Sequence, residues 1–308
     1  MSFLYKSDPI RGARWAELFA EQAPEIDFNI WPSTGDPKEV RYLAAWEPPE
    51  NLAETFPNLE IVFSIGAGID QFDLSRVPDN IPVVRMIESN LVAGMVEYAT
   101  LSVLAAHRDW IRYSAQQRQG TWKPMPSVTA NSRRIGVLGL GVLGTAVLTK
   151  LQTFGFQCAG WSRSEHSLPG IECFAGKDSL QSFLARSDIL LCMLPLTPAT
   201  RGILSRDLFQ HLPDGAVLIN IGRGGHLIET DLLDALESGQ ISAAILDVCN
   251  IEPLPQDHPF WHDPRIMLTP HIASMTHPDT AVAAVLDNLR RHHKGIPLNG
   301  LVDREHGY

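Results

Sequence analysis

The sequence predicts an α/β protein with two parallel sheets: a doubly wound Rossmann domain for a nucleotide cofactor, a smaller flavodoxin-like domain, and a cleft between them. Three observations predict this fold class. Short apolar runs alternate with helical stretches over residues 2–90, a glycine-rich loop lies between a strand and a helix at 139–144, and charged side chains directly follow apolar runs in the last third. Strand–helix alternation implies parallel strands with helices on both faces.

The first part of the chain predicts the smaller domain. Apolar runs predict strands at residues 3–5, 28–30, 42–46, 61–65 and 83–84, and helical spacing predicts helices over 14–22, 51–56, 94–119 and 278–294. The last helix is expected to return the chain to the first domain. We therefore assign residues 1–92 and 279–308 to the smaller, substrate domain and residues 93–278 to the NAD(P)-binding Rossmann domain. A chain of 308 residues exceeds the size at which one core usually stops growing.

The glycine-rich loop predicts a dinucleotide site. Residues 134–138 predict a buried strand, and Gly-Leu-Gly-Val-Leu-Gly follows at once before a helical pattern over 145–154. The first glycine permits a tight turn, the second lets the backbone approach a pyrophosphate, and the third lets helix and strand pack closely. The helix N-terminus adds N–H groups and a positive dipole end. We expect the cofactor to contact Gly139, Gly141, Val142, Leu143 and Gly144.

The end of the next strand, over residues 156–161, bears on cofactor choice. An acid at this point binds the ribose of NAD, whereas an arginine accommodates the 2′-phosphate of NADP. The chain has no acid here and continues Ser162, Arg163, Ser164, whose side chains suit a phosphate. We predict that NADPH is preferred and that NADH is possible. Arg163 is alternatively an ordinary surface cation, and Glu165 would repel a phosphate.

Three segments of the last third supply a cation, a carboxylate and an imidazole. Arg223 and Asp247 follow predicted strands, Glu252 comes shortly after, and His271 follows the apolar run 266–268. Ligands of such sheets bind beyond the carboxyl ends of strands, so these side chains could reach one crevice. An arginine can hold a carboxylate and a histidine can deliver a proton, which suits reduction of a 2-oxo acid.

Each of these residues also has a structural interpretation. Arg223 could be a surface charge, Glu252 a loop carboxylate, and His271 a hydrogen-bonded structural histidine. Gly222 and Gly224 favour the functional interpretation of Arg223, because they would let a ligand approach the main chain closely.

Composition bears on partners and location. The net charge of −10 gives no support to nucleic-acid binding, which normally leaves a basic surface. The cysteines form no Cys-x-x-Cys pair, and we expect no metal. We find no leader pattern at the start and no apolar run that we expect to span a bilayer, so no membrane contact and a cytoplasmic location are expected.

Taken together, the motifs resemble the D-isomer-specific 2-hydroxyacid dehydrogenase family over essentially the whole chain, and within it the bacterial reductases of glyoxylate and hydroxypyruvate. The matching segments are residues 64–70, 139–144, 194–197 with 200–201, and those that contain Arg223, Asp247, Glu252 and His271. The resemblance implies reduction of glyoxylate to glycolate and of hydroxypyruvate to D-glycerate. It also implies a homodimer.

The resemblance implies roles at the matching positions. Arg223 would hold the substrate carboxylate and polarise the carbonyl, His271 would protonate the carbonyl oxygen while the nicotinamide delivers hydride, and Glu252 would orient His271 and favour its protonated form. Further cofactor contacts would come from Leu194, Pro195, Thr200, Ile221 and Asp247. The substrate would lie against Trp46, Ile65, Gly66, Ala67 and Gly68.

Some alternatives remain open at this point. The loop over residues 65–68 could be a plain strand-to-helix turn, and Trp46 a packed tryptophan at a domain edge. The chain could act on another 2-hydroxy acid, or be a non-enzymatic NAD(H)-sensing regulator on the same fold.

Overall fold

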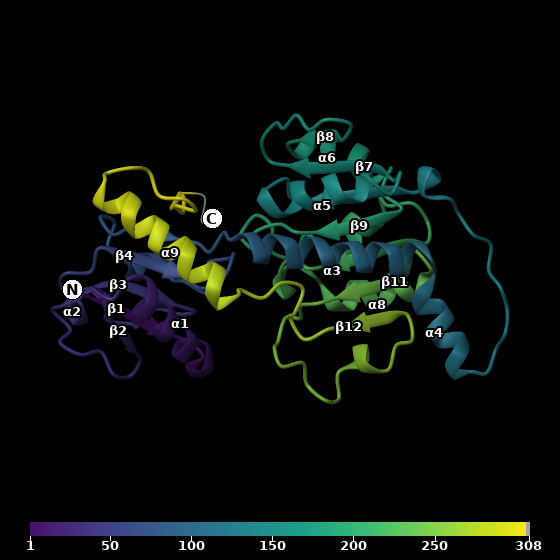
Figure 1. Ribbon diagram of the computed structural model, residues 1–308. Helices are drawn as coiled ribbons and strands as arrows, with labels where there is room; N and C mark the ends of the chain where they lie inside the picture. The colour runs from purple at the N-terminus through teal and green to yellow at the C-terminus, as the bar shows by residue number, and fades with distance from the viewer. Residues whose placement is uncertain (306–308) are drawn as a thin grey trace. The chain divides into compact units, whose positions relative to one another are not determined.

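The computed structural model describes residues 1–305 and divides into two compact units. Unit 1 comprises residues 1–91 together with the chain from residue 275 on, and unit 2 comprises residues 92–274. Each unit contains a parallel β-sheet with helices on both faces (Figure 1), as the strand–helix alternation predicts.

Unit 1 is built on a five-stranded parallel sheet with the order β2-β1-β3-β4-β5. Its strands are β1 (Ser2–Lys6), β2 (Asp27–Ile30), β3 (Val40–Ala45), β4 (Ile61–Ser64) and β5 (Val83–Val84). Alternate side chains of a strand point to opposite faces. Phe3 and Tyr5 accordingly pack with α1 (Pro9–Gln22) and α9 (Pro278–His293), whereas Leu4 packs with α2 (Leu52–Thr55) on the other face.

Helix α1 begins earlier than the apolar spacing indicates. The carboxylate of Asp8 accepts a hydrogen bond from the backbone N–H of Arg11 at 2.8 Å, and Pro9 occupies the first helical position. Both features are typical of helix starts, because they satisfy or remove N–H groups that lack an intrahelical acceptor. The cap therefore determines where the helix begins, because the first turn contains few of the apolar residues that indicate a helix in the sequence.

Unit 2 contains a seven-stranded parallel sheet with the order β12-β11-β10-β9-β6-β7-β8. The strands are β6 (Arg134–Leu138), β7 (Gln157–Ser162), β8 (Glu172–Ala175), β9 (Ile189–Cys192), β10 (Ala216–Asn220), β11 (Ile241–Leu246) and β12 (Ile266–Leu268). One face is covered by α3 (Ser89–His107) and α5 (Val142–Gln152) (Figure 1), and Ile111 of α4 (Trp110–Arg118) joins the same core. The other is covered by α6 (Lys177–Leu184), α7 (Arg206–Phe209) and α8 (Glu229–Ser238).

The long helix expected over residues 94–119 is two helices in the structure. Helix α3 ends at His107 and α4 begins at Trp110, because Asp109 between them has a left-handed backbone with φ of 55°. Aspartate is among the few residue types that adopt this conformation readily. The apolar pattern continues across the break, so the sequence alone does not show it.

The expectation that no apolar run suits a membrane needs correction at α3. By length and composition this helix is apolar enough to cross a bilayer, and about a third of its apolar stretch (33%) is buried within the chain. Met95, Ala99 and Val103 on this helix belong to the core of unit 2. A helix that covers a parallel sheet needs such an apolar face, so its composition has an explanation within the fold.

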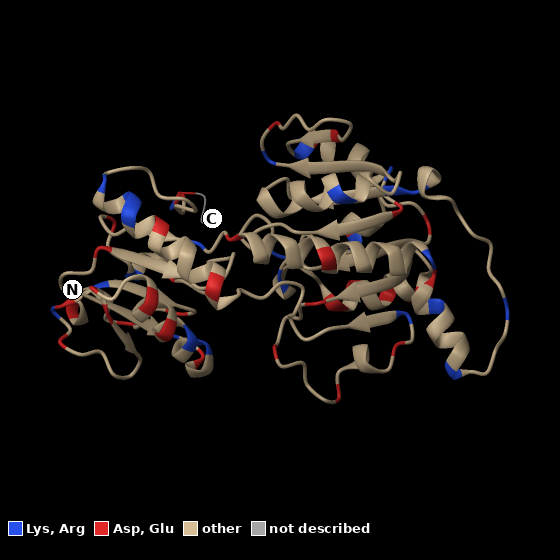
Figure 2. Ribbon diagram, in the orientation of Figure 1, with Lys and Arg blue, Asp and Glu red and all other residues tan. Residues whose placement is uncertain are grey.

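Charged side chains of both signs are interspersed over both units in residues 1–305 (Figure 2). With a net charge of −10, the overall field of the protein opposes the approach of an anion. Attraction of an anionic ligand therefore depends on individual cations, and the strand ends of unit 2 are where such a cation is expected.

Candidate active site

The carboxyl ends of three adjacent strands carry the predicted catalytic side chains. Arg223 lies three residues after β10, Asp247 directly follows β11, and His271 lies three residues after β12. The strands β12, β11 and β10 are neighbours in the sheet and run parallel. A cation, a carboxylate and an imidazole are therefore presented at one edge of unit 2, where ligands of such sheets bind.

His271 is paired with Glu252. Its Nδ1 lies 2.8 Å from Glu252 Oε2, and the other carboxylate oxygen accepts a hydrogen bond from the backbone N–H of Cys249 at 2.9 Å. An ionised carboxylate only accepts hydrogen bonds, so Nδ1 carries the hydrogen of this bond. The exposed fractions of the two side chains are 36% and 38%, which leaves Nε2 as the ring atom that can exchange a proton with a ligand.

The backbone of His271 is left-handed, with φ of 54°. Its N–H donates to the carbonyl of Asp247 at 2.8 Å, and the Asp247 carboxylate accepts from Thr269 Oγ1 at 2.6 Å and from the N–H groups of Ile272 and Ala273, each at 2.8 Å. Asp247 is 1% exposed, and a buried carboxylate needs such donors. Its oxygens thus hold the histidine segment, a role that the sequence analysis did not assign to it.

Arg223 lies on a loop that is tied to the rest of the edge by a buried histidine. The Nδ1 of His226 accepts from the N–H of Arg223 at 3.1 Å, and its Nε2 donates to the carbonyl of Pro195 at 3.2 Å. Arg223 Nη1 also donates to Gly222 O at 2.8 Å. His226 is 0% exposed and was missed in the sequence, because a histidine beside Leu227 has the pattern of any buried histidine.

The glycines beside Arg223 have a different explanation from the expected one. A Cβ at Gly224 would lie 1.9 Å from the carbonyl oxygen of Cys249, and a Cβ at Gly222 would lie 3.1 Å from His226 Nδ1. These glycines make room for the chain itself, so close packing of the backbone, and not approach of a ligand, explains Gly224. The support for Arg223 comes instead from its place at the strand end.

The glycine loop has the three features that its spacing predicts. Gly139 has φ of 110°, and a Cβ at Gly144 would lie 1.9 Å from the carbonyl oxygen of Gly139. A Cβ at Gly141, by contrast, would meet no atom of the described chain within 4 Å. Helix α5 begins next, at Val142, so its N-terminal N–H groups lie beside this open space. The loop fits a pyrophosphate.

The segment after β7 differs in detail from the expected phosphate site. Ser162 is the last residue of β7, is 8% exposed, and donates its hydroxyl hydrogen to the carbonyl of Ser164 at 2.6 Å. The carbonyl of Ser162 accepts a hydrogen bond from the N–H of Gly176 at 3.0 Å. Arg163 and Ser164 are exposed. In this arrangement a phosphate would meet Arg163 and Ser164 before it meets Ser162.

The remaining predicted cofactor residues line the strand ends between these segments. Leu194 and Ile221 are buried just after β9 and β10. Thr200 Oγ1 donates to the carbonyl of Pro195 at 2.7 Å and accepts from the N–H of Thr197 at 2.8 Å, which closes the loop after β9. Their contact with a cofactor stays a prediction.

In unit 1 the predicted substrate loop follows β4. The carbonyls of Ile65 and Gly66 accept from Thr276 Oγ1 at 2.8 Å and from the N–H of Met86 at 3.0 Å, and that of Gly68 accepts from Ser64 Oγ at 3.0 Å. The N–H of Ile65 donates to the carbonyl of Ala45 at 3.1 Å and that of Gly66 to Ser64 Oγ at 3.2 Å. The N–H groups of Ala67 and Gly68 are therefore the ones in this loop that suit an anion. Trp46 is 44% exposed, and its ring lies 3.2 Å from where a Cβ of Gly66 would be.

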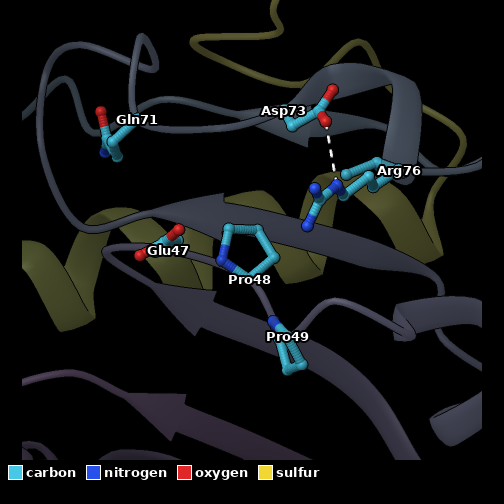
Figure 3. Close-up of a pocket in the computed structure, with 7 residues that line it drawn as sticks. Glu47, Pro48, Pro49, Gln71, Asp73 and Arg76 are labelled. Carbon is cyan, nitrogen blue, oxygen red and sulfur yellow. Dashed lines mark ion pairs between the residues drawn. The ribbon is translucent and has the colours of Figure 1, made fainter.

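A small hollow elsewhere in unit 1 is a weaker candidate. Figure 3 shows the side chains that line it, which come from Glu47, Pro48, Pro49, Gln71, Asp73, Arg76 and Val77. Its guanidinium, that of Arg76, pairs with Asp73 at 2.9 Å and with Glu50 at 3.5 Å. A cation already paired with two carboxylates attracts an anionic ligand weakly, so we place the candidate site at the strand ends of unit 2.

Comparison with known proteins agrees with the family that the sequence motifs resemble. A sequence model described as "D-isomer specific 2-hydroxyacid dehydrogenase, NAD binding domain" matches residues 100–273. Over the full length of both chains, the sequence is 38% identical to a protein named glyoxylate/hydroxypyruvate reductase A from Serratia proteamaculans.

Solved structures match the whole fold. A D-isomer specific 2-hydroxyacid dehydrogenase from Xanthobacter autotrophicus, in complex with NADPH and MES, has a TM-score of 0.95 and 39% identity, over 100% of this chain and 99% of that one. An NADPH-dependent glyoxylate/hydroxypyruvate reductase from Sinorhizobium meliloti, in complex with NADP and sulfate, has a TM-score of 0.92 and 32% identity over 100% of both chains.

Proposed function

This chain belongs to the D-isomer specific 2-hydroxyacid dehydrogenase family, and from this premise we propose that it is an NADPH-preferring reductase of small 2-oxo acids. The substrates are glyoxylate, which gives glycolate, and hydroxypyruvate, which gives D-glycerate. The observation that carries the proposal is the His271–Glu252 pair on the same sheet edge as Arg223 and the glycine loop.

The proposed roles follow from the chemistry of each side chain. Arg223 binds the substrate carboxylate through its planar guanidinium and draws electron density from the carbonyl oxygen. When bound, the nicotinamide cofactor supplies a hydride to the carbonyl carbon. His271 gives the proton on Nε2 to the carbonyl oxygen, and Glu252 keeps the opposite ring nitrogen as a donor.

The proposed cofactor contacts begin at the glycine loop. Gly139, Gly141, Val142, Leu143 and Gly144 hold the pyrophosphate, while Leu194, Pro195, Thr200, Ile221 and Asp247 contact the rest of the molecule. Arg163 and Ser164 bind the 2′-phosphate. The hydrogen bond from the Ser162 hydroxyl to the Ser164 carbonyl shapes the turn that carries them. Support for NADPH comes from the two related structures, which contain NADPH and NADP. NADH is also used, at lower efficiency.

We propose that the loop over residues 65–68 in unit 1 contacts the substrate carboxylate through the N–H groups of Ala67 and Gly68, because those of Ile65 and Gly66 donate within unit 1. Trp46 packs against Gly66 of this loop, so a bulky indole limits the space beside it. This arrangement favours oxo acids of two or three carbons over aromatic ones.

We also propose a homodimer and a cytoplasmic location, where reduced nicotinamide cofactors are available. Helix α4 and the segment after it extend beyond the end of α3 (Figure 1). They carry the exposed side chains of Trp110 and Trp122, at 65% and 100%. Large exposed aromatic side chains are typical of protein interfaces. Analytical ultracentrifugation should give twice the chain mass, and a monomer at all concentrations would contradict the dimer.

The test of the proposed function is NADPH oxidation by the purified protein with glyoxylate, hydroxypyruvate and phenylpyruvate. Glyoxylate and hydroxypyruvate should be reduced with much higher kcat/KM than phenylpyruvate. A higher kcat/KM for phenylpyruvate would indicate another 2-hydroxy acid. Binding of NADPH without turnover of any oxo acid would indicate a cofactor-sensing regulator instead.

A further inference from the structure

We propose that Tyr98 and Thr269 are positioning residues for His271 and act on it through the carboxylate of Asp247. The inference deepens the proposed function and rests on it, since it concerns how the proton donor is held. The hydroxyl groups of Tyr98 and Thr269 are hydrogen-bonded, and Thr269 Oγ1 lies 2.6 Å from Asp247 Oδ1. A chain of hydrogen bonds thus connects helix α3 with the loop of His271.

The direction of this chain follows from which groups have hydrogens. The Asp247 carboxylate only accepts, so the single hydroxyl hydrogen of Thr269 is directed at it. The Thr269 oxygen therefore accepts from Tyr98, whose hydroxyl must be the donor. Burial raises the pKa of Tyr98, which keeps this donor protonated. Each bond strengthens the next, as in other hydrogen-bonded networks in protein interiors.

The Asp247 carboxylate is the point where this chain meets the histidine loop. Its two oxygens also accept from the N–H groups of Ile272 and Ala273, which immediately follow His271. His271 itself has φ of 54°, a conformation that side-chain-bearing residues adopt at an energetic cost. Such a conformation persists when its surroundings determine it, and here the determinants are the donors gathered on Asp247.

The Tyr98 end of this chain of hydrogen bonds is anchored in the core of unit 2. Tyr98 lies beside Ala99, which is 0% exposed, and Ser102 Oγ donates to the Tyr98 carbonyl at 2.9 Å. Helix α3 also packs closely on the segment after the loop, since a Cβ at Gly94 would lie 3.2 Å from Ser274 Oγ. Helix α3 thus serves as a rigid support for the proton donor.

The experiment removes one link at a time. Tyr98→Phe deletes the donor to Thr269, and Thr269→Val replaces the hydroxyl by a methyl group of similar size. Thr269→Ser keeps the hydroxyl, and Tyr113→Phe on α4 is the matched control, because Tyr113 accepts a hydrogen bond from the N–H of Met125 well away from the site. Each variant is assayed for kcat and for KM towards NADPH. Hydrogen–deuterium exchange is measured on the peptide that contains residues 269–274.

We expect Tyr98→Phe and Thr269→Val to lower kcat about tenfold, as loss of a hydrogen bond to a charged group would, with the KM for NADPH nearly unchanged. The amides of residues 272 and 273 should exchange faster in both variants. Thr269→Ser and Tyr113→Phe should behave as the parent in both measurements.

Unchanged kcat and unchanged exchange in Tyr98→Phe and Thr269→Val would overturn the inference, as would equal losses in Thr269→Val and Thr269→Ser. If Tyr98→Phe does not fold, the Thr269→Val and Thr269→Ser pair still decides the outcome. The exchange measurement does not depend on turnover. A parent protein that oxidises no NADPH with any oxo acid would therefore contradict the proposed function, while the exchange rates would still test the hydrogen-bond chain.

Discussion

The glycine loop (residues 139–144) and the histidine loop (residues 269–273) follow strands at the same edge of the same sheet, yet they are held by different means. Gly139 has φ of 110° and His271 has φ of 54°, so both loops contain a left-handed residue. In the glycine loop the conformation costs little, because Gly139 has no side chain that would clash. In the histidine loop it is maintained by hydrogen bonds to Asp247.

This difference explains why the conformation of the glycine loop is evident in the sequence, whereas the conformation of the histidine loop and its support are not. A site that binds by close approach of the backbone needs absent side chains, which leave a pattern of glycines. A site that delivers a proton needs a side chain present at a defined angle, so a histidine must occupy a position that glycine would occupy more easily. Its support then comes from residues far away in the sequence.

The largest effect is expected from the side chain of the histidine loop. His271→Asn should lower kcat for glyoxylate by roughly a hundred- to ten-thousandfold, because the general acid is lost. Asparagine tolerates the left-handed conformation, so the loop should keep its fold. Steady-state assays measure the loss of kcat, and NADPH binding titrations check that the variant keeps its fold. Near-normal turnover would show that His271 is not the proton donor.

The next effect concerns the cation on the adjacent strand. Arg223→Lys keeps the charge but loses the planar fork that matches a carboxylate, so kcat/KM should fall roughly a hundredfold with either oxo acid. NADPH affinity is the internal control and should change little. Kinetics equal to those of the parent would place Arg223 outside the substrate site.

Two alanine substitutions in the glycine loop separate packing from binding. Gly144→Ala places a Cβ against the carbonyl of Gly139 and should lower the free energy of unfolding by about 1–3 kcal/mol. Gly141→Ala faces open space, so it should leave the unfolding free energy nearly unchanged but raise the KM for NADPH about tenfold. Thermal or urea unfolding and steady-state kinetics distinguish them. Equal stability losses in the two variants would contradict this division.

The last prediction concerns cofactor choice. A charge-assisted contact from Arg163 is worth about 1.5–3 kcal/mol when well formed, so NADPH should be preferred over NADH by roughly tenfold or more. Ser162→Asp combined with Arg163→Ala should shift the preference towards NADH, mainly through KM. Assays at matched, subsaturating concentrations of both cofactors measure this. Equal efficiency of the parent protein with NADH would show that this segment does not select the phosphate.

The sequence predicted the parts of this site that depend on local pattern. The strand–glycine–helix unit at Gly139 and the charged residues at strand ends follow from neighbouring residues, and the parallel sheets follow from strand–helix alternation. The family resemblance supplied the pairing of Glu252 with His271, which the structure shows at 2.8 Å.

The remaining features depend on contacts between distant segments. Nothing near His226 indicates that its ring connects Arg223 with Pro195, and nothing near Tyr98 indicates a bond to Thr269. The break at Asp109 interrupts an apolar pattern that itself continues. Such features arise only when the fold brings the segments together, so a single sequence does not contain a local signal for them.

Transfer of hydride from NADPH to the carbonyl carbon of a small 2-oxo acid, with formation of the D-isomer, can be tested directly. The protein is incubated with hydroxypyruvate and NADPH that carries deuterium at both positions of the reactive nicotinamide carbon. The enantiomers of glycerate are then separated by chiral chromatography, and the mass of the product is measured by mass spectrometry. We expect D-glycerate with deuterium bound to carbon 2. Unlabelled glycerate, the L-isomer, or unconsumed hydroxypyruvate would contradict it.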